Sequence, residues 1–384
     1  MESILNENVK NIQISGIRKF FNLVAEYDHV VSLTIGVPDF PTPDHVKKAA
    51  IQAIEENITT YTHNAGRLDV RKAACQFVKQ KYKLDYEEHE VIVTVGASEA
   101  IDIALRTILR KGDEVILPGP VYPGYEPLVQ LSGGQPIYAD VRKNGFNLTA
   151  DIIEKYITDR TKCIILPYPS NPTGVSLDEN ELKAIASLVK GKNIFIIADE
   201  IYSELTYGRA HVSISKFLKE QTILINGLSK SHAMTGWRIG LLFSSGKVVQ
   251  HMLKVHQYNV SCASSISQMA ALEALTNGID DALPMREEYQ KRRDYCYQEF
   301  AKMGIDVVLP DGAFYFFVPI PNGEPSFQFA TNLLREQRVA VVPGDAFSPL
   351  GEGYFRMSYA CSMEQLEKGL RGIMAYLKNS ENER

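Results

Sequence analysis

Short apolar runs alternate with mixed polar and apolar segments through the middle of the chain. The runs are VIVTV, EVILP, PIYADV, CIILP, IFIIAD, TILIN and RIGLLF. Several of them are continuously apolar, which is typical of strands that are covered on both faces of a mostly parallel sheet. Helix-like patterns separate them in SEAIDIALRTILR, YPGYEPLVQLSG and DENELKAIASLVK, the last opening with Asp178 at an N-cap position. This alternation predicts an α/β domain over roughly residues 45–280, in which helices flank a mostly parallel central sheet.

The rest of the chain predicts a second, smaller unit. A helical stretch at EEYQKRRDYCYQEFAK is followed by VVLPDGAFYFFVPI, by a helix near FQFATNLLREQ, by VAVVPG and YFRMSYA, and by a final helix from Met363 to Leu377. We expect residues 281–384 to form an α+β domain, which the N-terminal arm, residues 1–44, joins. No internal repeat or low-complexity linker separates these parts, so two interlocked domains are expected.

Composition excludes several classes of protein. The 384 residues are 45% hydrophobic, and the formal net charge is -5, with neither sign gathered into a long block. A nucleic-acid or membrane-surface partner is therefore not expected. The five cysteines are scattered without CxxC spacing, which argues against a disulfide framework or a metal site. The polar, acidic N-terminus and the lack of a long apolar stretch predict a cytoplasmic protein without a membrane span.

Candidate binding residues follow the predicted strands, where ligands of open parallel sheets bind. Gly96, Ala97 and Ser98 open a helix whose free N–H groups suit a phosphate, although a tight turn with Ser98 as N-cap explains them equally well. Asn171 lies in SNPTG, either as part of a β-α turn or with its amide directed at a ligand oxygen.

Charged groups at two further strand ends extend this pattern. Asp199 ends IFIIAD and precedes Glu200 and Tyr202, and either carboxylate could face inward. A buried carboxylate needs a cation, which can be a salt-bridge partner or a protonated heterocyclic nitrogen. Lys230 follows TILIN, and a desolvated lysine can attack an aldehyde, although most lysines are solvated surface charges. Together these residue types suit a phosphorylated pyridine aldehyde bound as a Schiff base.

On these residues the chain resembles the pyridoxal-phosphate-dependent aminotransferases of class I, which have the type I fold, over nearly its full length. The matching motifs are LTIGVPDFPTP, YTHNAGRLDVRKA, VTVGASEA, PGPVYPGY, PSNPTG, ADEIYSEL, LSKSHAMTGWRIG and FRMSYA. The resemblance implies that Lys230 holds pyridoxal phosphate as an internal aldimine and shuttles the proton. It assigns Asp199, rather than Glu200, to the pyridine nitrogen, and Asn171 and Tyr202 to the phenolic oxygen of the ring.

The same resemblance implies the remaining contacts of the cofactor and substrate. The phosphate would be bound by Ala97, Ser98, Ser229, Arg238 and Tyr61. Tyr61 would reach across from a second copy of the chain, so a homodimer with shared active sites is expected.

Four further assignments and one departure follow from the resemblance. Tyr122 would stack on the cofactor ring, Arg356 would bind the substrate α-carboxylate as a bidentate pair, and Gly36 would close over the substrate. Asn171 would contact the substrate as well as the cofactor. Gly227 departs from the family, since many relatives carry a serine there, and one phosphate hydroxyl is therefore expected to be missing.

The resemblance implies a ping-pong transamination from an amino acid to a 2-oxo acid, with 2-oxoglutarate as the expected acceptor. A carbon-sulfur lyase is the alternative, because the cofactor site alone does not decide the fate of the carbanion. A ligand-binding regulator is disfavoured, since the matching region begins almost at residue 1 and leaves no room for a DNA-binding segment. The pattern is similar to bacterial aminotransferase A enzymes, some linked to acetylated diaminopimelate in lysine synthesis. Candidates to meet the substrate side chain are Ile14, Arg18 and Tyr258.

Overall fold

The computed structural model describes residues 2–13 and 16–382 of the chain. Within this part, a seven-stranded sheet has the strand order β2-β8-β7-β6-β5-β3-β4. All neighbouring strands are parallel except β8, which runs antiparallel to both β2 and β7. The strands are β2 (Val91–Thr94), β3 (Glu114–Gly119), β4 (Gln135–Asp140), β5 (Thr161–Leu166), β6 (Phe195–Asp199), β7 (Thr222–Gly227) and β8 (Gly240–Phe243). The prediction of an α/β fold with a mostly parallel central sheet is confirmed.

The two faces of this sheet belong to separate hydrophobic cores. Ile116 and Ile196 pack into one core, while their chain neighbours Leu117 and Ile197 pack into the other. Because successive residues of a strand point to opposite faces, a continuous apolar run serves both cores.

Helices cover both faces. The first core includes residues of α3 (Asp44–Glu55), α4 (Leu68–Tyr82), α7 (Ala150–Glu154), α8 (Glu179–Val189), α9 (Ser215–Leu218) and α11 (Ser265–Thr276). The opposite core includes residues of α5 (Gly96–Ile108), α6 (Tyr125–Leu131) and α10 (Gly246–Val260). Asp178 caps α8 as predicted, because its Oδ1 accepts the backbone N–H of Glu181 at 2.8 Å.

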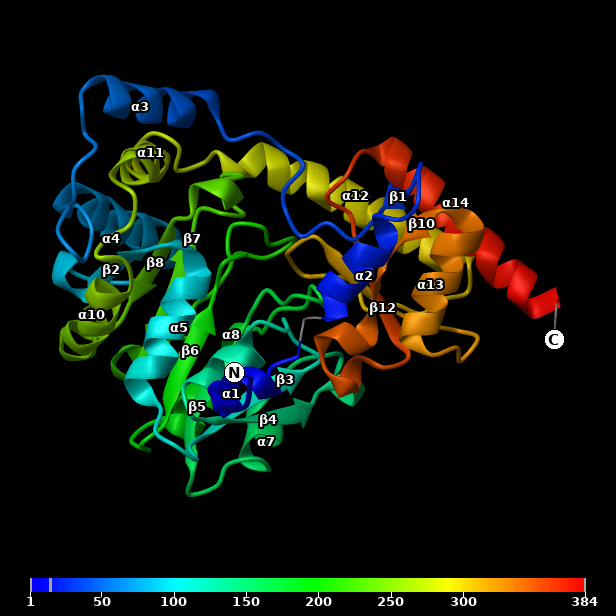
Figure 1. The fold of residues 1–384 in the computed structure, drawn as a ribbon, viewed down its shortest axis with the longest axis horizontal. Coiled ribbons are helices and arrows are strands. Elements are labelled where there is room, and N and C mark those ends of the chain that lie inside the picture. Colours follow the sequence, from blue (N-terminus) through cyan, green and yellow to red (C-terminus); the bar gives the residue numbers. More distant parts are fainter. Residues whose placement is uncertain (1, 14–15, 383–384) are drawn as a thin grey trace.

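A third core holds the smaller α+β domain together. Its antiparallel sheet has the order β11-β12-β9, and β1 pairs in parallel with β10. Figure 1 shows this domain beside the large sheet, with the long helix α12 leading into it. The elements are β1 (Val31–Ser32), β9 (Tyr315–Pro319), β10 (Val339–Ala340), β11 (Val342–Pro343), β12 (Tyr354–Ser358), α12 (Ala282–Lys302), α13 (Ser326–Gln337) and α14 (Met363–Asn382).

The N-terminal arm contacts both domains. Its helix α1 (Glu7–Asn11) lies beside α6, whereas α2 (Gly16–Val24) packs against β11 and places Phe20 in the core of the smaller domain. The domain boundaries at residues 44 and 280 stay predictions. Short 3-10 turns complete the chain at η1 (Glu2–Ile4), η2 (Glu88–Glu90), η3 (Arg142–Asn144), η4 (Lys219–Gln221), η5 (Thr235–Trp237), η6 (Gly344–Phe347) and η7 (Pro349–Gly351).

Two kinds of feature are absent from the described residues. None of their helices combines the length and apolar character that crossing a membrane requires. These same residues also contain no cluster of three or more His, Cys, Asp or Glu side chains that could hold a metal ion.

Candidate active site

A cavity of about 420 Å³ lies where the carboxyl ends of the parallel strands face the smaller domain. Residues of both domains and of the N-terminal arm line it. Of the residues that the resemblance assigns to the cofactor, to the substrate α-carboxylate and to closure over the substrate, all but Tyr61 line this cavity. They are Gly36, Ala97, Ser98, Tyr122, Asn171, Asp199, Tyr202, Ser229, Lys230, Arg238 and Arg356.

Lys230 enters the cavity from the loop that follows β7. Its Nζ donates to the backbone carbonyl of Gly36 at 2.6 Å, and the described residues include no carboxylate within ion-pair distance of it. Burial, with the charges of Arg356 and Arg238, lowers the pKa of Lys230 to about 8. An amine with such a pKa is neutral far more often than a surface lysine, and a neutral amine is the nucleophilic form.

Two adjacent carboxylates at the end of β6 face different surroundings. Asp199 lines the cavity, where its oxygens accept from the Tyr125 hydroxyl at 2.7 Å and from the Ile201 N–H at 3.3 Å. Glu200 instead lies 2.7 Å from Nε2 of the buried His211. Burial raises the pKa of Asp199, and the Tyr125 hydrogen bond opposes that rise. Asp199 is therefore the carboxylate available to a ligand in the cavity.

Arg356, on β12, brings a buried guanidinium to the opposite side of the cavity. It donates to Asn171 Oδ1 at 2.9 Å and to the carbonyl of Thr34 at 2.7 Å, and its Nε has no partner among the described residues. Its guanidinium also lies 4.4 Å from the centre of the Tyr315 ring. No carboxylate of the described chain pairs with it, so it does not form a structural salt bridge there. A buried cation with an unused N–H suits an anionic ligand.

One corner of the cavity is formed by the start of α5 and Arg238. Ala97 and Ser98 occupy the first turn, and Val95 rather than Ser98 is the N-cap, so the N-cap interpretation of Ser98 is wrong. Arg238 packs against Gly96 so closely that a Cβ there would collide with its guanidinium, and the φ of Gly96 is +78°. Glycine is therefore required for this approach. Free helix N–H groups beside a cation form a site suited to phosphate.

Of Ser229 and Gly227, only Ser229 lines the cavity. Ser229 is buried and lines the cavity. Gly227 is not among the residues that line the cavity, and it pairs with Gly240 across β7 and β8. A Cβ at Gly227 would lie 2.9 Å from the carbonyl oxygen of Ile239 and 3.3 Å from the Cα of Gly240. The close strand pairing therefore gives a steric reason for glycine at this position.

Three neutral side chains, those of Tyr122, Asn171 and Tyr202, also line the cavity. Tyr122 lines the cavity with a partly exposed ring held edge-on by Tyr125, 5.5 Å between centroids. Asn171 uses its Oδ1 to accept from Arg356, which leaves its amide N–H donors out of that bond. The buried hydroxyl of Tyr202 lies 2.9 Å from that of Tyr315.

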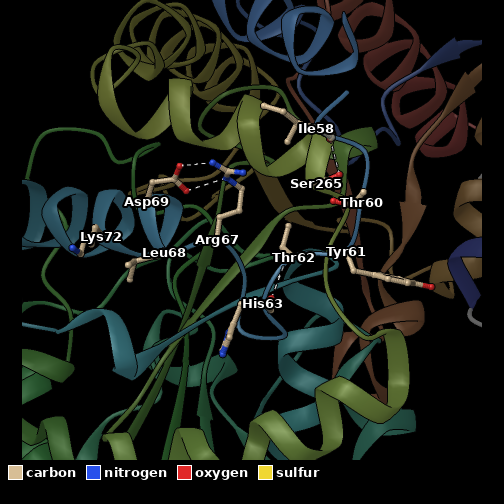
Figure 2. Close-up of a pocket in the computed structure, with 10 residues that line it drawn as sticks. All are labelled: Ile58, Thr60, Tyr61, Thr62, His63, Arg67, Leu68, Asp69, Lys72 and Ser265. Carbon is tan, nitrogen blue, oxygen red and sulfur yellow. Dashed lines mark hydrogen bonds and ion pairs between the residues drawn. The ribbon is translucent and has the colours of Figure 1, made fainter. Parts of the chain in front are cut away.

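Tyr61 is the exception among the residues that the resemblance assigns. Its side chain is 87% exposed and lines a separate groove of about 520 Å³, which is formed by the loop that follows α3, the start of α4 and Ser265 of α11. Figure 2 shows its ring projecting away from the other residues of that groove. Within one chain, Tyr61 does not reach the cavity.

The candidates for the substrate side chain lie elsewhere as well. Ile14 falls outside the described residues, Arg18 is exposed on α2, and Tyr258 is 86% exposed at the end of α10. None of the described candidates lines the cavity. Ile17 and Phe21 of α2 do line it, and the apolar spacing of Ile17, Phe20, Phe21 and Val24 is the sequence signal that could have found them.

Sequence reasoning also missed two buried tyrosines that line the cavity, Tyr125 and Tyr315. Tyr125 lies inside the PVYPGY motif, three residues after Tyr122, but a tyrosine in an amphipathic helix is ordinarily a core residue. Tyr315 lies in the aromatic strand FYFF, where its neighbours carry no signal that separates it from the core.

Comparisons with known proteins agree over almost the whole chain. The family model described as "Aminotransferase class I and II" matches residues 28–373. The chain is similar to a probable N-acetyl-LL-diaminopimelate aminotransferase of Bacillus subtilis (strain 168), with 60% identity over 96% of this chain and 95% of that protein.

Solved structures are similar as well. An aromatic aminotransferase from Pyrococcus horikoshii OT3 has a TM-score of 0.89 and 36% identity, covering 95% of this chain and 99% of that one. Thermus thermophilus aspartate aminotransferase with maleate has a TM-score of 0.91 and 34% identity, covering 97% of this chain and 99% of that one.

Proposed function

The chain belongs to the class I and II aminotransferases, and from this premise we propose its substrates and the roles of the residues around the cavity. It is an aminotransferase that uses pyridoxal phosphate and acts on amino acids and 2-oxo acids. The proposed amino donor is N-acetyl-LL-diaminopimelate, an intermediate of lysine synthesis. The proposed acceptor is 2-oxoglutarate, in a two-half, ping-pong transamination.

The residues around the cavity fit pyridoxal phosphate. Asp199 is a buried carboxylate with only hydroxyl and amide donors among the described residues, which leaves room for a protonated ring nitrogen. The start of α5 beside Arg238 suits the phosphate, and Lys230 suits the aldehyde. When bound, the cofactor supplies a protonated pyridine ring that accepts the electron pair left on the substrate Cα.

The chain's own groups would then orient the substrate and move the proton. Arg356 would hold the α-carboxylate through its fork of N–H donors. Lys230 Nζ would remove the proton from the substrate Cα and pass it to the cofactor, while Tyr122 would pack against the ring and Asn171 and Tyr202 would hydrogen-bond the ring oxygen. The convergence of Lys230, Asp199 and Arg356 on one cavity is the observation that carries the proposal.

Two observations support the donor. A probable N-acetyl-LL-diaminopimelate aminotransferase shares 60% identity with this chain. Ile17 and Phe21 of α2, together with Val37, form an apolar wall of the cavity, which suits the methylene chain of a long amino acid.

A substrate panel tests the donor. The holoenzyme is incubated with N-acetyl-LL-diaminopimelate, aspartate or phenylalanine and with 2-oxoglutarate, and glutamate formation is measured. We expect kcat/KM for the acetylated donor to exceed the others by about 10²-fold, the discrimination that a few favourable contacts provide. A preference for aspartate or phenylalanine would contradict the donor. Release of pyruvate and ammonia from a sulfur amino acid such as cystathionine, incubated without an oxo acid, would indicate the lyase instead.

A homodimer with shared active sites is part of the proposal. Large apolar side chains are exposed on α3, on the loop that follows it, at the start of α4 and at the end of α10, namely Ile51, Ile54, Tyr61, Leu68 and Tyr258. The loop and the α10 end are tied together, because Asn64 Nδ2 donates to the carbonyl of Ser261 at 2.7 Å. An exposed apolar surface of this kind is typical of a protein–protein interface. Across this interface, Tyr61 would reach the start of α5 and Arg238 in the second copy, where the phosphate is proposed to bind.

Tyr61→Phe should weaken cofactor binding about 10-fold, because one hydrogen bond to a charged phosphate is lost. The measurement is the Kd of the cofactor by equilibrium titration of the apoenzyme, with the mass in solution checked by light scattering. Tyr258→Phe is the matched control, since Tyr258 is equally exposed, and it should leave the Kd unchanged. A fully active monomer, or equal effects of both changes, would rule out the shared site.

A further inference from the structure

We infer that Tyr315 is a positioning residue that strengthens Tyr202 as a hydrogen-bond donor to the phenolic oxygen of the cofactor. This inference rests on the proposed role of Tyr202. Tyr315 would act through Tyr202, across the junction of the two domains, and without itself bonding the cofactor oxygen.

The two hydroxyls are held together by their surroundings. Tyr315 begins β9 of the smaller domain and Tyr202 follows β6 of the large domain, and both are buried. Their hydroxyl oxygens lie 2.9 Å apart, within hydrogen-bond distance. Their rings meet edge to face, with 5.9 Å between centroids and 80° between planes.

Tyr315 has little freedom to move its hydroxyl away. In the β9–β12 register, Ser358 lies opposite Tyr315 and Arg356 opposite Phe317, so Arg356 and Tyr315 project from the same face of the small sheet. The Arg356 guanidinium covers the Tyr315 ring at 4.4 Å. A Cβ added at Gly36 would lie 3.2 Å from the Tyr315 hydroxyl oxygen, so the Gly36 backbone also lies close to this hydroxyl.

A count of protons gives the direction of the bond. Among the described residues, each hydroxyl has the other as its hydrogen-bond partner. Each hydroxyl carries one proton, and one contact uses only one of the two. If Tyr202 donated to Tyr315, it would have no proton left for the cofactor. If Tyr315 donates to Tyr202, the Tyr202 proton stays free for the phenolic oxygen, which is the only arrangement that allows the proposed role.

The hydrogen bond from Tyr315 would make the Tyr202 hydroxyl a stronger donor to the cofactor. A hydroxyl that accepts a hydrogen bond becomes a stronger donor, because the bonds of a chain polarise one another. A stronger donor to the phenolic oxygen lowers the affinity of the neighbouring Lys230–cofactor linkage for its proton. Tyr315 would therefore lower the pKa at which that linkage titrates.

Tyr315→Phe tests this while keeping the ring under Arg356. The absorbance of the purified holoenzyme is titrated against pH, and the pKa of the Lys230–cofactor linkage should rise by about half a pH unit to one unit. Tyr202→Phe should raise it further, by about one to two units. The double variant should match Tyr202→Phe alone, because Tyr315 acts only through the Tyr202 hydroxyl.

Tyr359→Phe is the matched control. Tyr359 is a buried tyrosine of the same domain whose hydroxyl lies 3.5 Å from that of Tyr207 and donates to the Ala313 carbonyl at 3.2 Å, and it does not line the cavity. Its loss should leave the linkage pKa unchanged. An unchanged pKa in Tyr315→Phe, or shifts that add in the double variant, would overturn the inference. A wild-type protein without any titrating band would instead overturn the proposed role of Lys230, so the two failures can be told apart.

Discussion

Lys230→Ala should lower kcat by about 10⁴-fold or more, because the change removes both the amine that binds the cofactor and the group proposed to move the proton. The absorbance of the covalent linkage should disappear from the purified protein at the same time. Single-turnover kinetics with the amino donor measure the first effect, and an absorbance spectrum measures the second. Full turnover by this variant would refute the catalytic role.

Lys230→Arg separates charge from nucleophilicity. Arginine keeps a cation at this position but stays protonated, so it should fail to link the cofactor and should be about as inactive as alanine. If arginine restored most of the activity, the lysine would act only as a charge.

The low pKa of Lys230 also predicts how cofactor attachment depends on pH. Burial lowers this pKa to about 8, so about one side chain in ten is neutral at pH 7. The rate at which the apoenzyme forms the linkage should therefore rise with pH and level off above about pH 8. A rate that kept rising to pH 10 would indicate an ordinary, solvated lysine.

Asp199→Asn should lower kcat by about 10²- to 10³-fold, the cost of removing one well-placed electrostatic partner. Asparagine keeps the size of the side chain but removes the negative charge that would keep the ring nitrogen protonated. Without that proton the ring is a poorer acceptor for the electron pair of the substrate. The measurement is kcat with the cofactor at saturation, so that weakened binding is not mistaken for slower chemistry.

Glu200→Gln is the matched control for this change. Glu200 is the next residue and is equally buried, but it pairs with His211 rather than lining the cavity. The glutamine should keep a kcat within a few-fold of wild type, although the protein loses stability as a buried pair is broken. A cofactor methylated at the ring nitrogen, which carries a fixed positive charge, should restore part of the activity of Asp199→Asn. Equal losses from both substitutions, or no rescue, would contradict the role of Asp199.

Much of the fold follows from local patterns. Continuous apolar runs predicted buried strands, and Ile116 and Leu117 show why, since adjacent residues fill cores on opposite faces. The cap of α8 by Asp178 could also be predicted from the sequence, because an N-cap depends on residues close in the chain. The antiparallel direction of β8 could not be predicted, because pairing partners far apart in sequence decide whether a strand runs parallel or antiparallel.

For the candidate site, the sequence by itself determined which residue types follow each strand, and so that a lysine, a carboxylate and an arginine were available. The pattern of residues left Asp199 and Glu200 open and the family resemblance favoured Asp199, and the structure places Asp199, not Glu200, at the cavity. Only the tertiary structure decided that Arg356 meets Asn171 and that Tyr315 meets Tyr202. The physical reason is that burial of apolar side chains is encoded by local spacing. Contacts between polar groups instead depend on where distant strands and loops come together in space.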